Sequence, residues 1–144
     1  MAVPNEPERR DTRLAVLCAR LAEPGGPLAE DAGLRALAAD AVARVRQGRD
    51  RDEIDACLDE LEDGLLAAGH TAGLGAYRTV PAQPHPAFEP LPGLGAGRPL
   101  LEVLTCPRER CTRVEAPPAP GASAAGPPHC ALFGEPLKPF DVTP

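Results

Sequence analysis

Residues 100–115 read LLEVLTCPRERCTRVE and set two cysteines, Cys106 and Cys111, between two segments with strand-like patterns. Successive side chains of residues 100–105 alternate between the two faces of an extended strand, and residues 112–115 can pair back across the intervening turn. The stretch therefore predicts an antiparallel strand pair with both thiols in its connection. In a reducing compartment, thiols at such spacing are more often metal ligands than disulfide partners.

A second stretch of the same kind follows at residues 129–137, HCALFGEPL, where His129 and Cys130 stand side by side. The two stretches resemble a zinc ribbon, in which two loops at the ends of β-hairpins each supply two thiolates or imidazoles to one tetrahedral ion. The second loop of many zinc ribbons reads Cys-x-x-Cys-Gly-x-x-Leu, and here Phe133 stands where the last cysteine belongs. The resemblance covers residues 100–139.

The resemblance implies a structural zinc ion with the ligands Cys106, Cys111, Cys130 and His129. The fourth ligand is the open question, because neighbours on an extended strand point in different directions and His129 directly precedes a thiol ligand. A histidine from elsewhere, such as His85 or His70, or a water molecule would also complete the four donors that zinc prefers.

The apolar content of the C-terminal third gives a physical reason to expect a metal. Units of about this size usually need a metal, disulfides or a partner to fold, and structural zinc contributes an apparent free energy of about 10 to 16 kcal/mol at neutral pH. One alternative is a ribbon that has lost its metal and is held by packing of Leu132, Phe133 and Phe140. Another is a poorly ordered tail with incidental cysteines, and a Cys106–Cys111 disulfide or iron–sulfur ligation has less support.

The N-terminal half predicts helices over residues 9–22, 28–46 and 50–69, each with apolar residues at helical spacing. Asp11 is expected to cap the first helix, Gly48 to end the second, and Asp50 with Glu53 to form a capping box on the third. Cys18 and Cys57 fall on the apolar faces, where cysteine behaves as a small hydrophobic residue, so both are predicted to belong to the core. A short fourth piece is expected near residues 71–77.

These elements predict an α+β protein in three parts. Residues 1–78 would form an antiparallel three-helix bundle, residues 79–99 a proline- and glycine-rich linker, and residues 100–144 the zinc-ribbon-like β unit. Residues 116–128, rich in proline, alanine and glycine, are expected to protrude as a loop.

No acid, base and nucleophile converge in the sequence, which favours a non-enzymatic adaptor or accessory protein over an enzyme. Its protein partner would dock on apolar helix faces, around Leu14 to Leu21 and Ile54 to Leu65. One alternative is a nucleic-acid-associated regulator that contacts phosphates through Arg108, Arg110 and Arg113. Another is a thiol- or metal-responsive switch that uses Cys106, Cys111 and Cys130.

Charge and hydropathy bear on partners and location. The net charge is −6, and residues 1–78 carry fifteen acidic against ten basic side chains. This acidity disfavours nucleic-acid binding by the whole chain, although a local contact stays open. Neither a signal peptide nor a membrane span is visible in the sequence, so we expect a cytoplasmic protein without a membrane partner.

Overall fold

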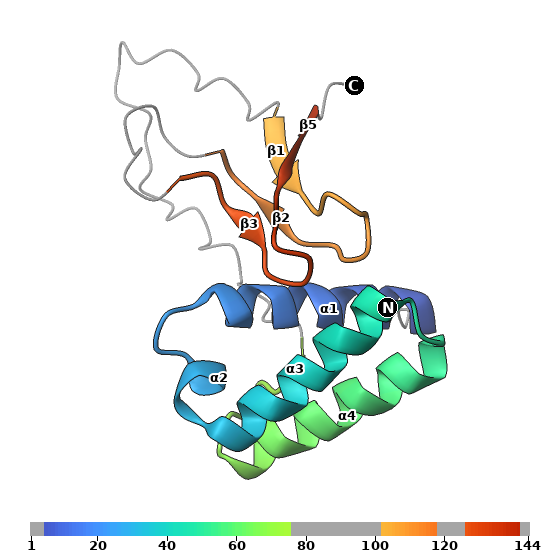
Figure 1. Ribbon diagram of the computed structural model, residues 1–144, viewed down its shortest axis with the longest axis vertical. Helices are drawn as coiled ribbons and strands as arrows, with labels where there is room; N and C mark the ends of the chain where they lie inside the picture. The colour runs from blue at the N-terminus through green and yellow to red at the C-terminus, as the bar shows by residue number, and fades with distance from the viewer. Residues whose placement is uncertain (1–4, 76–101, 118–125, 142–144) are drawn as a thin grey trace, which may run out of the picture.

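The computed structural model describes residues 5–75, 102–117 and 126–141, and these residues form an α+β protein (Figure 1). Its helices are α1 (Glu6–Ala22), α2 (Pro27–Glu30), α3 (Ala32–Gln47) and α4 (Arg51–Ala67). Its strands are β1 (Glu102–Thr105), β2 (Val114–Glu115), β3 (His129–Cys130), β4 (Glu135–Pro136) and β5 (Lys138–Asp141). The predicted linker, residues 79–99 with His85, lies outside these residues.

The helix starts differ from those predicted, because local side-chain hydrogen bonds decide them. Helix α1 begins after Asn5, whose side chain forms a capping box with Glu8, and Asp11 lies inside the helix. The predicted helix 28–46 is divided, because Asp31 accepts hydrogen bonds from the backbone amides of Gly33 (2.8 Å) and Leu34 (3.0 Å) and so starts α3 afresh. The described part of the chain therefore contains three long helices and the single turn α2.

The end of α3 agrees with the prediction, whereas the cap at the start of α4 does not. Gly48 ends α3 in the left-handed conformation, as predicted, with φ 65°. Asp50 precedes α4, but its side chain makes no capping hydrogen bond, so the predicted capping box is absent there. After α4 the residues that follow form turns up to residue 75, and Leu74 is fully buried among the helices.

The helices bury one shared core of leucine, isoleucine, valine, alanine and cysteine side chains. Its helical members are Leu14, Leu17, Cys18, Leu28, Leu34, Ala38, Ala41, Val42, Val45, Ile54, Cys57, Leu58, Leu61 and Leu65. The apolar faces of α1 and α4, which the sequence predicted to bind a partner, thus pack into the protein's own core.

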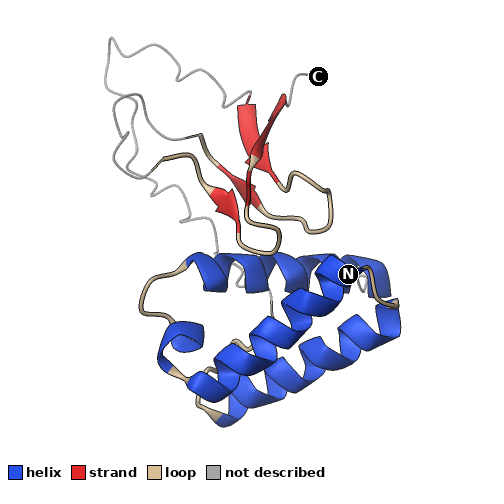
Figure 2. Cartoon of the chain, in the orientation of Figure 1, coloured by secondary structure: helices blue, strands red, loops and turns tan. Residues whose placement is uncertain are grey.

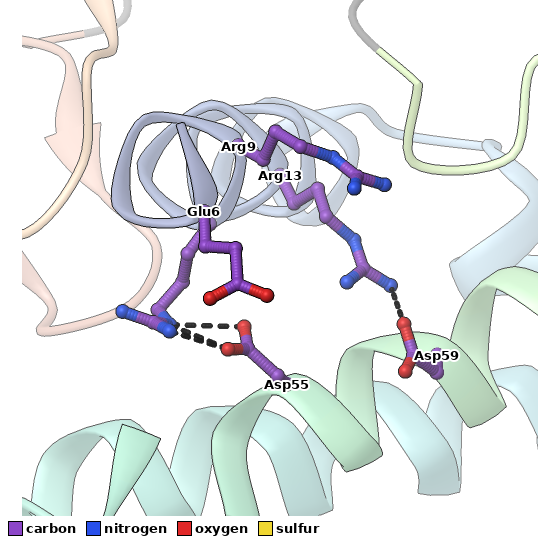
Figure 3. Close-up of a pocket in the computed structure, with 6 residues that line it drawn as sticks. Glu6, Arg9, Arg13, Asp55 and Asp59 are labelled. Carbon is purple, nitrogen blue, oxygen red and sulfur yellow. Dashed lines mark hydrogen bonds and ion pairs between the residues drawn. The ribbon is translucent and has the colours of Figure 1, made fainter. Parts of the chain in front are cut away.

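Charged side chains join α1 to α4 at the edge of this core (Figure 3). The guanidinium of Arg10 donates to both carboxylate oxygens of Asp55, at 2.9 and 3.0 Å from its Nε. One turn further along, Arg13 donates to Asp59 at 2.7 Å and lies 3.0 Å from Glu62. The hollow between these groups is lined by charged residues, and four of them form the two ion pairs just described, so we assign it to packing of the two helices.

The strands form two small antiparallel sheets, one ordered β2-β1-β5 and one of β3 with β4. Figure 2 shows the strands in red beside the blue helices. The pairing of β1 with β2, Thr105 opposite Val114, is the one predicted across the first thiol loop. The pairing of β1 with β5, Val103 opposite Phe140, was not predicted. The β unit lies beside α1, and its loops also approach the end of α3 (Figure 1).

The β unit is held on the helices by two hydrogen bonds without sulfur and by several that involve the sulfur of Cys18. The backbone amide of Thr112 donates to the carbonyl of Asp11 at 3.4 Å, and Arg46 of α3 donates to the carbonyl of Leu132. The amide of Ala131 donates to the sulfur of Cys18 at 3.3 Å.

Among the described helices, none has the length and apolar character needed to cross a membrane.

Candidate metal centre

The first thiol loop turns tightly after β1 and surrounds the sulfur of Cys106 with backbone amides. The amide of Glu109 donates to the carbonyl of Cys106 at 3.2 Å, and Glu109 adopts the left-handed conformation with φ 55°. Burial alone would raise the pKa of the Cys106 thiol. Hydrogen bonds from the backbone of Arg110, Arg108 and Cys111 outweigh this effect, so the pKa is lowered overall. The loop is therefore built to stabilise a thiolate.

The second thiol loop repeats this construction after β3. The amide of Gly134 donates to the carbonyl of Cys130 at 2.7 Å, and Gly134 is left-handed with φ 69°. Burial raises the pKa of Cys130 to about 11, and hydrogen bonds from the amides of Phe133 and Leu132 partly oppose that rise. Each loop thus presents one buried sulfur that accepts backbone hydrogen bonds.

A third element, α1, brings Cys18 to the same place. Its sulfur lies 3.9 Å from the sulfur of Cys130, and Cys18 is 0% exposed. A hydrogen bond with Cys111 lowers the pKa of Cys18 to about 5, against the opposing effect of burial and with further help from Arg113. The same hydrogen bond raises the pKa of Cys111, which acts as the donor. Four thiols, from α1 and the two loops, therefore share one buried junction.

These four thiols, Cys18, Cys106, Cys111 and Cys130, are called the thiol cluster below. Its hydrogen-bonded pairs are Cys18 with Cys111 and Cys106 with Cys111, besides the Cys18–Cys130 contact. Within the described ranges, no three or more His, Cys, Asp or Glu side chains are arranged as a group that could already hold a metal ion. The cluster is thus a set of pairwise contacts and not a preformed coordination shell.

His129, the predicted fourth ligand, lies away from the cluster. Its side chain is exposed whereas that of Cys130 is fully buried, as expected for neighbours on strand β3. Only its backbone carbonyl approaches the junction, where it accepts a hydrogen bond from Arg113 at 3.2 Å. The backbone irregularity that would bring both side chains to one point is not present.

Cys18 is the residue that sequence reasoning missed. Its burial in the core was predicted and is confirmed, but the three thiols beside it were not foreseen. Helical periodicity identifies a buried cysteine without showing which element covers it. A count of cysteines could have indicated it. The two loops supply three thiols, zinc prefers four donors, and two further cysteines lie in the helices.

The three arginines near the loops have different surroundings. Arg113 is buried, donates to the Cys18 sulfur at 3.0 Å and forms an ion pair with Glu115. Arg108 pairs with Glu135 and lies over the ring of Phe133, 4.9 Å from its centroid. Arg110 is exposed. The three do not form a common cationic surface.

Cys57 lies outside the thiol cluster and provides a comparison. Its thiol donates to a carboxylate oxygen of Asp40 at 3.3 Å. Burial, followed by that hydrogen bond, raises the pKa of Cys57. All five cysteines are unpaired by disulfides.

A hollow of about 480 Å³ opens beside the three-stranded sheet, next to the first thiol loop. Its walls include Val103, Thr105, Cys106, Cys111, Val114 and Phe140. Phe140 is 55% and Val114 58% exposed, the largest exposures among the bulky apolar residues of the described chain. Asp11, Glu109, Thr112 and Lys138 complete its lining, and Lys138 pairs with Glu109.

No protein-family model, curated protein or solved structure matches this chain.

Proposed function

We propose that this protein is a non-enzymatic adaptor whose β unit is a structural zinc-ribbon-like module, with Cys106, Cys111 and Cys130 as zinc ligands. The observation that supports this most directly is the common construction of the two thiol loops. In each, a cysteine at the end of a strand accepts backbone hydrogen bonds at its sulfur, and a left-handed residue turns the chain, Glu109 in one loop and Gly134 in the other.

The chemistry of the donors favours zinc over harder cations. Thiolates are soft ligands, and amide hydrogen bonds to sulfur offset their negative charge. The β unit itself buries few bulky apolar side chains, among them Leu104, Leu132 and Leu137. A bound ion would supply the cohesion that such a small unit otherwise lacks. A cytoplasmic location fits this proposal, because a reducing compartment keeps the thiols available.

The burial of the thiols argues for a structural role over a catalytic one. Cys106 and Cys130 are almost completely covered, so a substrate has little access to their sulfurs. A cysteine nucleophile also needs a positioned base, and the imidazole of His129, the neighbour of Cys130, faces away from it.

Metal analysis of the purified protein tests the zinc module. The protein should be prepared under reducing conditions with zinc in the medium, and its metal content measured by elemental analysis. We expect about one zinc per chain, loss of zinc in Cys106→Ser and full retention in the control Cys57→Ser. A wild-type protein without zinc would refute the module.

The sheet face around Phe140 is our candidate for the adaptor's partner-binding surface. Its apolar centre, Val103, Val114 and Phe140, is bordered by Lys138 and the acidic Glu109, an apolar core with a polar rim as in protein interfaces. We propose that it binds a protein segment with apolar side chains. This surface replaces the helix faces, which are buried.

A matched pair of variants tests the partner surface. Phe140→Glu places a charge at the centre of this face, and Leu66→Glu places one on α4, where Leu66 is 47% exposed. Partners recovered from lysates of the source cells should be lost with Phe140→Glu and kept with Leu66→Glu. Equal recovery by both variants would rule out this face, and a wild-type dimer dispersed only by Phe140→Glu would identify the partner as a second copy.

A further inference from the structure

We infer that Cys18 of α1 is the fourth ligand of the metal, so that one ion joins the helices to the β unit. This inference rests on the zinc module proposed above and assigns the ligand that the module lacks. The second loop has Phe133 where a zinc ribbon usually has its second thiol, and the ring of Phe133 is covered by Arg108. A donor must therefore come from outside the loop.

The position of Cys18 meets the geometric requirement. Two thiolates on a tetrahedral zinc, each about 2.3 Å from the ion, have sulfurs about 3.8 Å apart. The sulfurs of Cys18 and Cys130 lie 3.9 Å apart, and Cys18 also hydrogen bonds with Cys111. Cys18 thus already contacts one thiol of each loop.

The approach of α1 to the loops is fixed by contacts that do not need a metal. The Thr112 amide bonds to the Asp11 carbonyl, and Arg46 bonds to the Leu132 carbonyl. One of these bonds lies at each thiol loop. Cys18 is therefore held at the junction by the fold.

The charges near the cluster suit four thiolates. Each thiol loses one proton to solvent when it binds zinc, so four thiolates and Zn²⁺ carry a net charge of −2. The buried guanidinium of Arg113 lies 3.0 Å from the Cys18 sulfur and offsets part of that charge. The amide of Ala131, 3.3 Å from the same sulfur, adds a neutral donor of the kind that the loop sulfurs receive.

Cobalt substitution tests this assignment, because sulfur-to-cobalt charge-transfer absorption grows with the number of thiolate ligands. Apoprotein is titrated with Co²⁺ for the wild type, Cys18→Ser and the control Cys57→Ser. We expect Cys18→Ser to lose about a quarter of the charge-transfer intensity, one thiolate in four. Its cobalt affinity should fall at least about tenfold, the lower limit seen for residues that only support a ligand. Cys57→Ser should match the wild type.

The outcomes separate this inference from the proposed function. A wild type that binds neither cobalt nor zinc overturns both. A wild type that binds metal, with a Cys18→Ser variant of unchanged absorption and affinity, overturns only the role of Cys18. If Cys18→Ser fails to fold, X-ray absorption of the zinc-loaded wild type decides: four sulfurs at about 2.3 Å support the inference, and three sulfurs with one nitrogen or oxygen near 2.0 Å refute it.

Discussion

At the scale of single residues, Arg113 connects the thiol cluster, the second loop and strand β2. It is 9% exposed and donates to the Cys18 sulfur, the His129 carbonyl and the Glu115 carboxylate. Arg113→Met keeps much of the side-chain volume but removes its hydrogen bonds to those acceptors. We expect the free energy of unfolding, measured by urea denaturation with zinc in excess, to fall by about 2 to 4 kcal/mol.

Arg110 is the control for this measurement, because it is exposed on the same loop. Arg110→Met should leave the urea midpoint nearly unchanged. Equal midpoints for the two variants would show that the contacts of Arg113 add little to stability.

Phe133 is half-buried against the core and stacks under Arg108. Phe133→Ala removes this packing but no sulfur, so the zinc content should persist while the β unit loosens. We expect the free energy of unfolding to fall by about 1 to 3 kcal/mol, less than for a fully buried phenylalanine. Elemental analysis and urea denaturation of the same sample check both parts, and loss of zinc would show that the ring is needed to shape the metal site.

The thiols show how far single residues can be read from sequence. The strand-turn-strand pattern around Cys106 and Cys111 involves only neighbouring residues, so the sequence predicts it, and the pairing of β1 with β2 confirms it. Cys18 and Cys130 meet across 112 residues of chain, and no local pattern records such a contact. His129 adjoins Cys130 in the sequence, but neighbouring side chains of an extended strand point in opposite directions.

At the scale of elements, the starts of α3 and α4 offer a direct comparison. Asp31 accepts two backbone hydrogen bonds at the start of α3, whereas Asp50 makes none at the start of α4. Asp31→Ala should therefore lower the free energy of unfolding by about 1 kcal/mol, and Asp50→Ala by clearly less. Urea denaturation of the two variants in one buffer checks the difference, and a larger loss for Asp50→Ala would contradict it.

The strands were harder to predict than the helices. The helices carry long apolar periodicities, so their existence was clear even where a cap shifted a boundary. Strand β5, Lys138–Asp141, is short and contains Pro139, which lacks the N–H of a central strand. It is tolerated because β5 lies at the edge of the sheet, beside β1 alone. Only the tertiary pairing reveals that position.

At the scale of the whole molecule, the helical core and the β unit should respond differently to metal removal. The helical core is made of residues such as Ala38, Leu58 and Leu61, which are buried without help from sulfur ligands. After treatment of the zinc-loaded protein with a strong chelator, amide hydrogen exchange should accelerate in β1 and β5 and change little in α3 and α4. Uniform acceleration across both parts would mean that they unfold together.

The distance along the chain between Cys18 and Cys130 also bears on how the protein is made. The ribosome adds Cys130 112 residues after Cys18, which takes roughly 6 to 22 s at about 5 to 20 residues per second. During that interval the newborn α1 carries a thiol whose covering loop does not yet exist. An oxidant or another metal ion can therefore react with the Cys18 thiol before the other three thiols of the cluster are in place. The protein is most sensitive to such damage during its synthesis.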